Sequence, residues 1–166
     1  MAFHRALGVL EKIVSFPSVS VTSNAAITEY IYDRLQALPL RLELLSYRDA
    51  NDVEKVNLVA TTNTRPRSAT GGYVYCAHTD VVPADGWEYP HADAFTLHKT
   101  PDRLYGRGSC DMKGSLACFL GALETLPFDQ LTAPVSLICT ADEEIGYHGA
   151  KHVAENSEIY RQLVAQ

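Results

Sequence analysis

Four short apolar runs constrain the fold of this chain more than any other feature of its sequence. Their length is typical of strands, and proline, glycine or charged turn residues bound them. The runs cover residues 40–47, 56–60, 73–77 and 135–140. Apolar residues at helical spacing fill the segments around them, at residues 3–16, 24–35, 111–126 and from 149 onward. This order predicts an α/β fold with helices on both faces of a sheet.

Two local features refine this prediction. Asn24 can cap the second helix, because an asparagine side chain at that position accepts a hydrogen bond from the first helical turn. The charged stretch from Asn51 to Lys55 lies between two apolar runs and predicts a turn.

Composition and charge argue against several classes of protein. The chain is 46% hydrophobic and 20% charged, which is the balance of a folded domain rather than a disordered one. A net charge of −6 and the lack of a Lys/Arg cluster argue against nucleic acid as a partner. No apolar run approaches the roughly 20 residues of a membrane span. The cysteines form no CxxC pair and no secretory signal precedes them, so we expect reduced thiols and a cytoplasmic protein.

The first chemically distinctive cluster is His78-Thr79-Asp80, directly after the apolar run 73–77. In an extended segment, the side chains of His78 and Asp80 point to the same side. A histidine that binds metal needs an acceptor for its second ring N–H, and an aspartate commonly provides it. The alternative is a histidine at a strand end that hydrogen-bonds to a turn. Taken alone, this motif favours that alternative.

The second cluster is the glycine-rich stretch 104–114. Gly106 and Gly108 permit positive φ angles, so Asp111 can be presented from a tight turn at the start of a helix. A dinucleotide-binding loop would need a glycine where Asp111 stands, and a phosphate-binding loop would need Gly-Lys-Ser/Thr, whereas Lys113 precedes Gly114 here. In isolation, the Asp111 carboxylate could also interact only with the dipole at the helix N-terminus, without binding a metal.

The third cluster is Asp142-Glu143-Glu144, which follows the run 135–140. Adjacent carboxylates repel one another unless a cation neutralises them. A divalent metal would use one carboxylate as a ligand and leave another as a general base. The alternative is a solvated acidic loop, which is weakened because an apolar strand delivers these residues. Together, the three clusters place histidine and carboxylates at the carboxyl ends of predicted strands, which predicts a site for zinc or a similar ion.

Three stretches of the chain carry the signatures of a known family. They read His78-Thr-Asp-Val-Val-Pro83, Tyr105-Gly-Arg-Gly-Ser-Cys-Asp-Met-Lys-Gly114 and Asp142-Glu-Glu-Ile-Gly146. In this order they resemble the M20 metallopeptidase family. The resemblance implies a three-layer α/β/α fold with a mostly parallel central sheet, as in the N-terminal part of a zinc-exopeptidase-like catalytic domain.

The resemblance also implies a role for each site residue. His78 would bind one Zn²⁺, Glu144 would bind a second, and Asp111 would bridge both ions; Co²⁺ is a possible substitute. Asp80 would orient His78, and Glu143 would be the general base that moves a proton from water to the leaving amine.

The segments Val81–Trp87 and Phe95–Leu97 look closer to the acetylornithine deacetylase branch of the family than to its desuccinylase branch. That branch implies removal of an acyl group from an N-acyl amino acid, with N-acetylornithine giving ornithine and acetate in arginine biosynthesis. The partner of the protein would then be a small-molecule substrate.

The chain departs from the family pattern in length. Family members have a further carboxylate ligand, a late histidine ligand and an inserted dimerisation or lid domain. Residues 1–166 would therefore form a partial catalytic domain without that lid domain and without the C-terminal catalytic segment. We expect this chain to be weak or inactive alone. The alternative is a non-catalytic remnant that binds metal weakly or serves as an interaction module. Apolar surface left uncovered would favour self-association.

Overall fold

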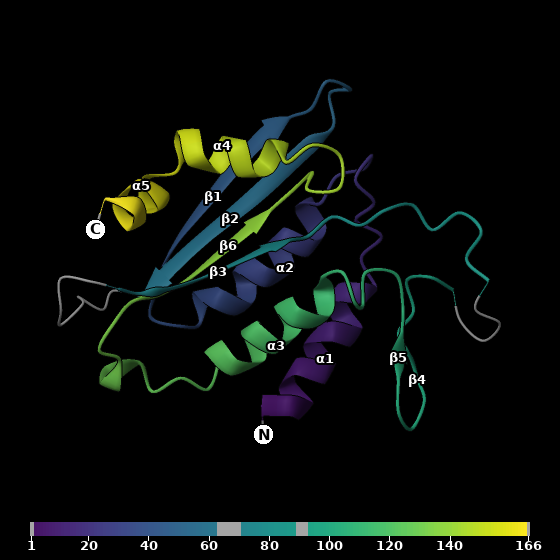
Figure 1. Cartoon of the computed structure of the whole chain (residues 1–166), viewed down its shortest axis with the longest axis horizontal. Helices are drawn as coiled ribbons and strands as arrows, with labels where there is room; N and C mark the ends of the chain where they lie inside the picture. The colour runs from purple at the N-terminus through teal and green to yellow at the C-terminus, as the bar shows by residue number, and fades with distance from the viewer. Residues whose placement is uncertain (1, 63–70, 89–92, 166) are drawn as a thin grey trace.

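A four-stranded sheet with the order β1-β2-β6-β3 lies at the centre of the fold (Figure 1). The computed structural model describes residues 2–62, 71–88 and 93–165. The sheet consists of β1 (Leu40–Arg48), β2 (Glu54–Thr62), β3 (Tyr73–His78) and β6 (Val135–Thr140). Each strand contains one of the four apolar runs, so the strand prediction is confirmed. A separate small hairpin is formed by β4 (His98–Lys99) and β5 (Leu104–Tyr105).

Helices cover both faces of the sheet, which confirms the three-layer α/β/α prediction. One face carries α1 (Ala2–Val14), α2 (Ala25–Gln36) and α3 (Lys113–Leu123). The other face carries α4 (His148–Asn156) and α5 (Glu158–Val164) (Figure 1). A single 3-10 turn, η1 (Phe128–Gln130), precedes β6. In the part of the chain that the structure describes, no helix combines the length and apolarity needed to cross a membrane.

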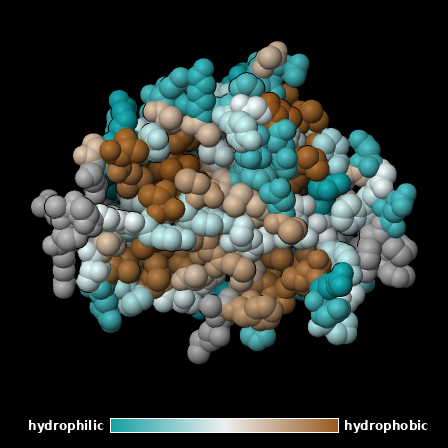
Figure 2. Space-filling view, in the orientation of Figure 1, coloured by the Kyte–Doolittle hydropathy of each residue, from teal (hydrophilic) through white to brown (hydrophobic). Residues whose placement is uncertain are grey.

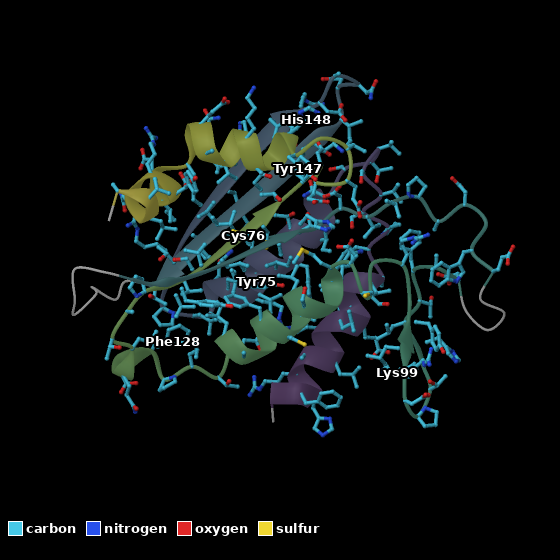
Figure 3. The ribbon with its side chains drawn as sticks, viewed as in Figure 1. Tyr75, Cys76, Lys99, Phe128, Tyr147 and His148 are labelled. Carbon is cyan, nitrogen blue, oxygen red and sulfur yellow. The ribbon has the colours of Figure 1, made fainter. Side chains whose placement is uncertain are left out.

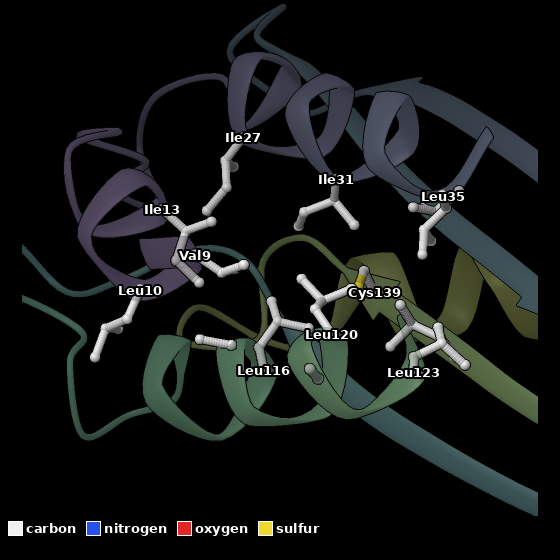
Figure 4. Packing of buried hydrophobic residues seen from close by; sticks show 14 of the residues in the cluster. Val9, Leu10, Ile13, Ile27, Ile31, Leu35, Leu116, Leu120, Leu123 and Cys139 are labelled. Carbon is white, nitrogen blue, oxygen red and sulfur yellow. The ribbon is translucent and has the colours of Figure 1, made fainter. Parts of the chain in front are cut away.

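The main core lies between the sheet and the layer of α1, α2 and α3 (Figure 4). α2 contributes Ile27, Ile31 and Leu35, and all three are fully buried. Their four-residue spacing puts them on one face of the helix. Leu116 and Leu120 of α3 lie across the core from this face (Figure 4). Burying each side chain of this size contributes roughly 1.5–3 kcal/mol, so this cluster is the main source of fold stability.

A smaller core lies on the opposite face of the sheet. Val59 of β2 and Ile138 of β6 pack there against Val153 of α4 and Ile159 of α5. The strand β3 lies at the edge of the sheet, and Val74 in it remains 45% exposed. Figure 2 shows apolar side chains gathered between α4 and α3, where β3 runs. This edge is therefore less covered than the rest of the sheet.

The prediction of a mostly parallel sheet is wrong. Among the strands of the described residues, β3 and β6 pair in parallel, whereas the pairings of β1 with β2 and of β2 with β6 are antiparallel. The antiparallel pairing of β1 with β2 follows from their short connection, since a tight hairpin can join only antiparallel strands. In that connection, the Asp49 carboxylate accepts hydrogen bonds from the main-chain N–H groups of Asn51 and Val53.

Two local predictions also fail. Asn24 makes no side-chain cap; its amide instead donates to the carbonyl of Val56 and accepts from the N–H of Val56, which joins α2 to β2. The stretch from Asn51 to Lys55 is a turn only in its first part, because β2 already begins at Glu54 and Lys55 is 1% exposed. A tertiary partner outweighs the local preference in both cases.

Candidate metal centre

His78 is the last residue of β3, and its ring is almost fully buried. Its Nδ1–H donates to the main-chain carbonyl oxygen of Asp80 at 2.9 Å. Its Nε2 lies 3.0 Å from Oδ1 of Asp111 and 3.8 Å from Oε2 of Glu143. Burial alone would lower the pKa of His78, but the Asp80 carbonyl and the nearby carboxylates outweigh it and raise the pKa. One ring nitrogen is thus fixed, and the other faces anionic oxygens.

The Asp80 carboxylate is 2% exposed and holds the acidic loop. It accepts hydrogen bonds from the main-chain N–H groups of Glu143 at 3.1 Å and Glu144 at 3.3 Å, and from the hydroxyl of Ser20 at 2.7 Å. Its Oδ1 lies 3.7 Å from Nδ1 of His78, beyond hydrogen-bonding distance. Asp80 therefore contacts the histidine ring through its carbonyl oxygen, while its carboxylate contacts the loop that follows β6.

Asp111 lies in the turn that precedes α3, and its side chain is 77% exposed. The peptide bond between Asp111 and Met112 is cis. Gly108 shapes this turn with a φ of +74°, and a Cβ there would lie 2.5 Å from Cγ1 of Val81. The N–H of Lys113 donates to the carbonyl of Gly108 at 2.9 Å. The prediction that Asp111 is presented from a tight turn at the start of a helix is confirmed, whereas the prediction that each cluster stands at the end of a sheet strand is wrong for Asp111.

The three acids after β6 do not face the same way. Asp142 is fully buried, and its Oδ1 lies 2.8 Å from Nζ of Lys55, while Tyr47 donates its hydroxyl proton to Oδ2 at 2.7 Å. Glu143 and Glu144 are only partly exposed and lie on the His78 side. The sequence reasoning treated these carboxylates as one repelling group. Lys55 removes Asp142 from that group, so a pair of glutamates remains.

His78, Glu143 and Glu144 bring one ligand atom each to within 4.8 Å of one another. Partial burial raises the pKa of Glu144; His78 opposes this, and the carboxylates of Asp111 and Glu143 add to it. Imidazole nitrogen and crowded carboxylates are the donor set that Zn²⁺ and similar divalent ions prefer. The residues present therefore fit a divalent cation, and Asp111 adds a further carboxylate beside His78.

The candidate metal centre combines a buried histidine with two partly exposed glutamates. A hollow of about 440 Å³ lies beside α4, lined among others by Asp142 and His148, but His78 and Glu143 do not line it. Figure 3 shows His148 and its neighbour Tyr147 at the start of α4. Glu143 is 35% exposed at its side chain. Glu143 is thus partly accessible to solvent, whereas His78 is not.

The sequence reasoning missed two residues that organise this site, Ser20 and Lys55. Ser20 lies in the loop between α1 and α2 and has no distinctive motif around it. Lys55 sits next to Glu54 in a charged stretch, which is typical of solvated turns. The sequence feature that could have indicated burial of Lys55 is its position directly before an apolar run. That feature does not identify Asp142 as its buried partner. Both residues matter only through contacts with chain segments far away in sequence.

Comparison with known proteins identifies related sequences. The family model described as "Peptidase family M20/M25/M40" matches residues 74–165, a range that contains all five predicted site residues. The acetylornithine deacetylase of Proteus mirabilis is 36% identical over 154 residues, covering 89% of this chain and 38% of that protein. The acetylornithine deacetylase of Myxococcus xanthus is 38% identical over 147 residues, covering 88% and 37%. The succinyl-diaminopimelate desuccinylase of Rickettsia prowazekii is 34% identical over 152 residues, covering 88% and 38%.

Solved structures share the fold at lower sequence identity. Human carnosine dipeptidase 1 superimposes with a TM-score of 0.74 at 22% identity, covering 92% of this chain and 35% of that protein. An M20 family metallo-carboxypeptidase from Sulfolobus solfataricus gives a TM-score of 0.71 at 23% identity, covering 91% and 34%. The chain spans about 38% of the length of the first curated relative that it matches.

Proposed function

The chain belongs to peptidase family M20/M25/M40, and on that premise we propose that it forms the metal-binding part of an amide hydrolase acting on N-acyl amino acids. One observation carries this proposal. His78 ends β3, whereas Glu143 and Glu144 follow β6, yet their ligand atoms lie within 4.8 Å of one another. Asp111 adds a carboxylate 3.0 Å from the same histidine. Such convergence of imidazole and carboxylates is what a hydrolytic metal site requires.

In this proposal, His78, Asp111 and Glu144 hold Zn²⁺ or Co²⁺. The bound ions supply Lewis-acid polarisation of the amide carbonyl and a lowered pKa for water. Glu143 accepts a proton from the attacking water and delivers it to the leaving nitrogen. The C–O bond forms first at the carbonyl carbon and the C–N bond then breaks as the nitrogen receives the proton, so that a carboxylate and a free amine result. The general base needs freedom to swing between water and amine, which agrees with the partial exposure of Glu143.

Asp80 keeps the other groups in place in this proposal. Its carbonyl holds the Nδ1–H of His78, which leaves Nε2 as the metal-binding nitrogen. Its carboxylate holds the main-chain N–H groups of Glu143 and Glu144. Asp80 therefore orients His78, as the family resemblance implies. It also fixes the position of the acidic loop.

The proposed substrate is N-acetylornithine, which gives ornithine and acetate. Two of the curated relatives with 36% and 38% identity are named acetylornithine deacetylases, and this supports the assignment. The segments Val81–Trp87 and Phe95–Leu97 of the sequence point to the same branch. A place in arginine biosynthesis follows from this substrate, and a cytoplasmic location agrees with the free cysteines.

We further propose that residues 1–166 are a partial catalytic domain with little activity alone. By the family pattern, one metal would have only His78 and Asp111 from this chain, and the other only Glu144 and Asp111. Catalytic zinc usually has three protein ligands, so two predict weak binding. A non-catalytic module that binds metal weakly is the alternative function, and the same ligand count favours it.

One experiment tests these proposals together. Zn²⁺ and Co²⁺ are titrated into the full chain by calorimetry, and deacetylation of N-acetylornithine is assayed on the same sample. We expect weak metal binding and little turnover, with Glu143→Gln retaining the metal and losing any turnover. Metal binding that survives His78→Ala unchanged would contradict the proposed site. Metal binding by the wild type without detectable turnover in any condition would favour the non-catalytic module.

Self-association through β3 is a further part of the proposed function. In the described part of the chain, β3 pairs with β6 on one side and with no strand on the other. Its residues carry no acidic, lysine or arginine side chain, and Tyr73, Val74 and Cys76 are exposed. An uncharged open edge is a template for strand pairing. The occupant that we propose is β3 of a second copy, paired antiparallel about a twofold axis.

A further inference from the structure

We propose that Ser20 is a positioning residue for the candidate metal centre, because it is tied to the acidic loop through both Asp80 and Lys55. The proposal rests on the proposed function, since it assigns Ser20 a role in that site. Ser20 belongs to the loop between α1 and α2 and is 2% exposed. In the described residues its hydrogen-bond partners are Asp80, Val81 and Lys55, so its effect on His78 and the two glutamates passes through them.

The first connection runs through the Asp80 carboxylate. A carboxylate that is 2% exposed needs several donors, because water cannot supply them. The Ser20 hydroxyl donates to Oδ2 at 2.7 Å, beside the main-chain N–H groups of Glu143 and Glu144. In the described residues, Ser20 is the only side chain that donates a hydrogen bond to this carboxylate. Its hydroxyl therefore fixes the orientation in which the carboxylate receives the two loop amides.

The second connection runs through the ammonium group of Lys55. The main-chain carbonyl of Ser20 accepts a hydrogen bond from Nζ of Lys55. The same ammonium group lies 2.8 Å from Oδ1 of Asp142, the residue directly before Glu143. Lys55 and Asp142 are 1% and 0% exposed, so this ion pair is shielded from water. The carbonyl of Ser20 is thus connected through Lys55 to Asp142, the first residue of the acidic loop. Its hydroxyl is connected through Asp80 to the two glutamates that follow.

Ser20 can act as an anchor because its own position is fixed. Its N–H donates to the carbonyl of Val81 at 3.0 Å, and the N–H of Val81 donates to the carbonyl of Ser18 at 3.0 Å. Val19 and Val81 form a parallel bridge between these hydrogen bonds. The loop is therefore paired like a short strand with the segment that carries Asp80. Loss of the Ser20 hydroxyl would therefore change the hydrogen bonding of Asp80, because the paired loop cannot rearrange to compensate.

Ser18 provides a matched control in the same loop. It is 3% exposed, and its hydroxyl donates to the main-chain carbonyl of Thr79 at 2.6 Å. Ser18→Ala and Ser20→Ala each remove one buried hydroxyl that bonds to the same neighbouring segment. Only Ser20→Ala removes a donor from a carboxylate. A purely structural role predicts the same outcome for both variants, whereas positioning predicts different outcomes at the acidic loop.

The experiment compares the full wild-type chain with Ser18→Ala, Ser20→Ala and Ser20→Thr. Amide hydrogen exchange of Glu143 and Glu144 is measured by NMR, and Co²⁺ binding is measured from its visible absorption. We expect Ser20→Ala to speed exchange at both amides about tenfold or more, since hydrogen bonds to charged groups are worth that much. We expect its Co²⁺ affinity and visible spectrum to change as well. Ser18→Ala should change neither, and Ser20→Thr, which retains a hydroxyl, should restore both.

Unchanged exchange at Glu143 and Glu144 in Ser20→Ala, or an equal effect of Ser18→Ala, would overturn the proposal. If Ser20→Ala does not fold, Ser20→Cys keeps a similar shape with a weaker donor and gives the same comparison. A wild-type chain that binds no Co²⁺ would contradict the proposed function alone. The amide exchange rates would still decide the role of Ser20, because they do not depend on a metal.

Discussion

Lys55 and Asp142 form an ion pair with 2.8 Å between Nζ and Oδ1, and neither side chain is more than 1% exposed. The pair joins β2 to the loop that follows β6. Removing one partner leaves a buried charge without compensation, which costs about 3–5 kcal/mol. We therefore expect Lys55→Met to lower the free energy of unfolding by that amount in urea denaturation.

The double variant Lys55→Met/Asp142→Asn tests the origin of this loss. It leaves neither Lys55 nor Asp142 as an unpaired charge, so its destabilisation should be smaller than the sum for the two single variants. Additive losses would show that the ion pair itself contributes nothing to the fold.

Divalent metal should stabilise the folded chain. A ligand that binds only the folded state raises the free energy of unfolding by about 2.7 kcal/mol at a hundredfold excess over its dissociation constant. We expect the Tm to rise with Zn²⁺ concentration and to return to its starting value with a chelator. His78→Ala should abolish this rise. His4→Ala is the matched control, because His4 is exposed on α1, away from the candidate ligands. An equal rise in the His78→Ala variant would place the binding elsewhere.

Glu43 should make stability depend on pH. It caps α5, since its carboxylate accepts hydrogen bonds from the Ser157 hydroxyl and from the N–H groups of Glu158 and Ile159. Partial burial favours the neutral form, but these hydrogen bonds outweigh it and lower the pKa of Glu43. A lowered folded-state pKa means that Glu43 stabilises the fold above its unfolded-state pKa. This contribution is lost as the pH falls through the folded-state pKa.

The variant Glu43→Gln measures this contribution. At pH 7 we expect it to lower the free energy of unfolding by about 1 kcal/mol, the usual value of a helix cap. In more acidic solution, where wild-type Glu43 is also neutral, the difference between the two proteins should shrink. Urea denaturation at both pH values checks this, and a difference that is constant with pH would contradict the assignment.

Gly108→Ala should disturb the turn that carries Asp111. A side chain at a φ of +74° is strained, and its Cβ would lie 2.5 Å from Cγ1 of Val81. We expect a loss of about 1–3 kcal/mol in the free energy of unfolding and weaker binding of Zn²⁺. Gly8→Ala is the control: Gly8 lies in α1 with no atom within 4 Å of a new Cβ, so it should stabilise by about 0.5–1 kcal/mol. Calorimetry with both variants tests the comparison.

Association through β3 makes a prediction about Cys76. Antiparallel pairing about a twofold axis brings equivalent central residues of the two strands together, and Cys76 is exposed near the middle of β3. We expect mild oxidation to link two copies through Cys76. Val74→Lys should prevent both the link and association, because a charge on an edge strand opposes pairing.

Cys118→Ser is the control for that experiment, because Cys118 is also exposed but lies on α3. It should leave the crosslink intact, whereas Cys76→Ser should remove it. Sedimentation that gives a monomer at every concentration would reject the proposed pairing of β3.

Much of the fold was predictable because it depends on local pattern. The strands β1, β2, β3 and β6 coincide with short apolar runs bounded by proline, glycine or charged turn residues. The helices coincide with segments in which apolar residues recur at helical spacing. Strand direction was not predictable in this way. The pairing of β6 with both β2 and β3 is a contact between distant parts of the chain, and no local pattern encodes it.

The candidate site shows the same division. His78, Asp111 and Glu144 stand in short motifs whose chemistry can be interpreted from the sequence. The motif Asp142-Glu143-Glu144 gave no indication that Asp142 pairs with Lys55. Burial of a lysine depends on partners that are distant in sequence, and a local motif does not identify them. Ser20 has an ordinary hydroxyl, and only its place between Asp80 and Lys55 makes it distinctive.

The strand order β1-β2-β6-β3 also has a consequence for how the molecule assembles. During synthesis, β3 leaves the ribosome well before β6, and in the described part of the chain β6 is its only neighbour in the sheet. The strand that carries His78 must therefore wait for a later strand before it can be locked in place. Such distant pairing is slow compared with local hairpin formation. The β1–β2 hairpin can form early, whereas the arrangement of the candidate metal centre depends on the later pairing of β3 with β6.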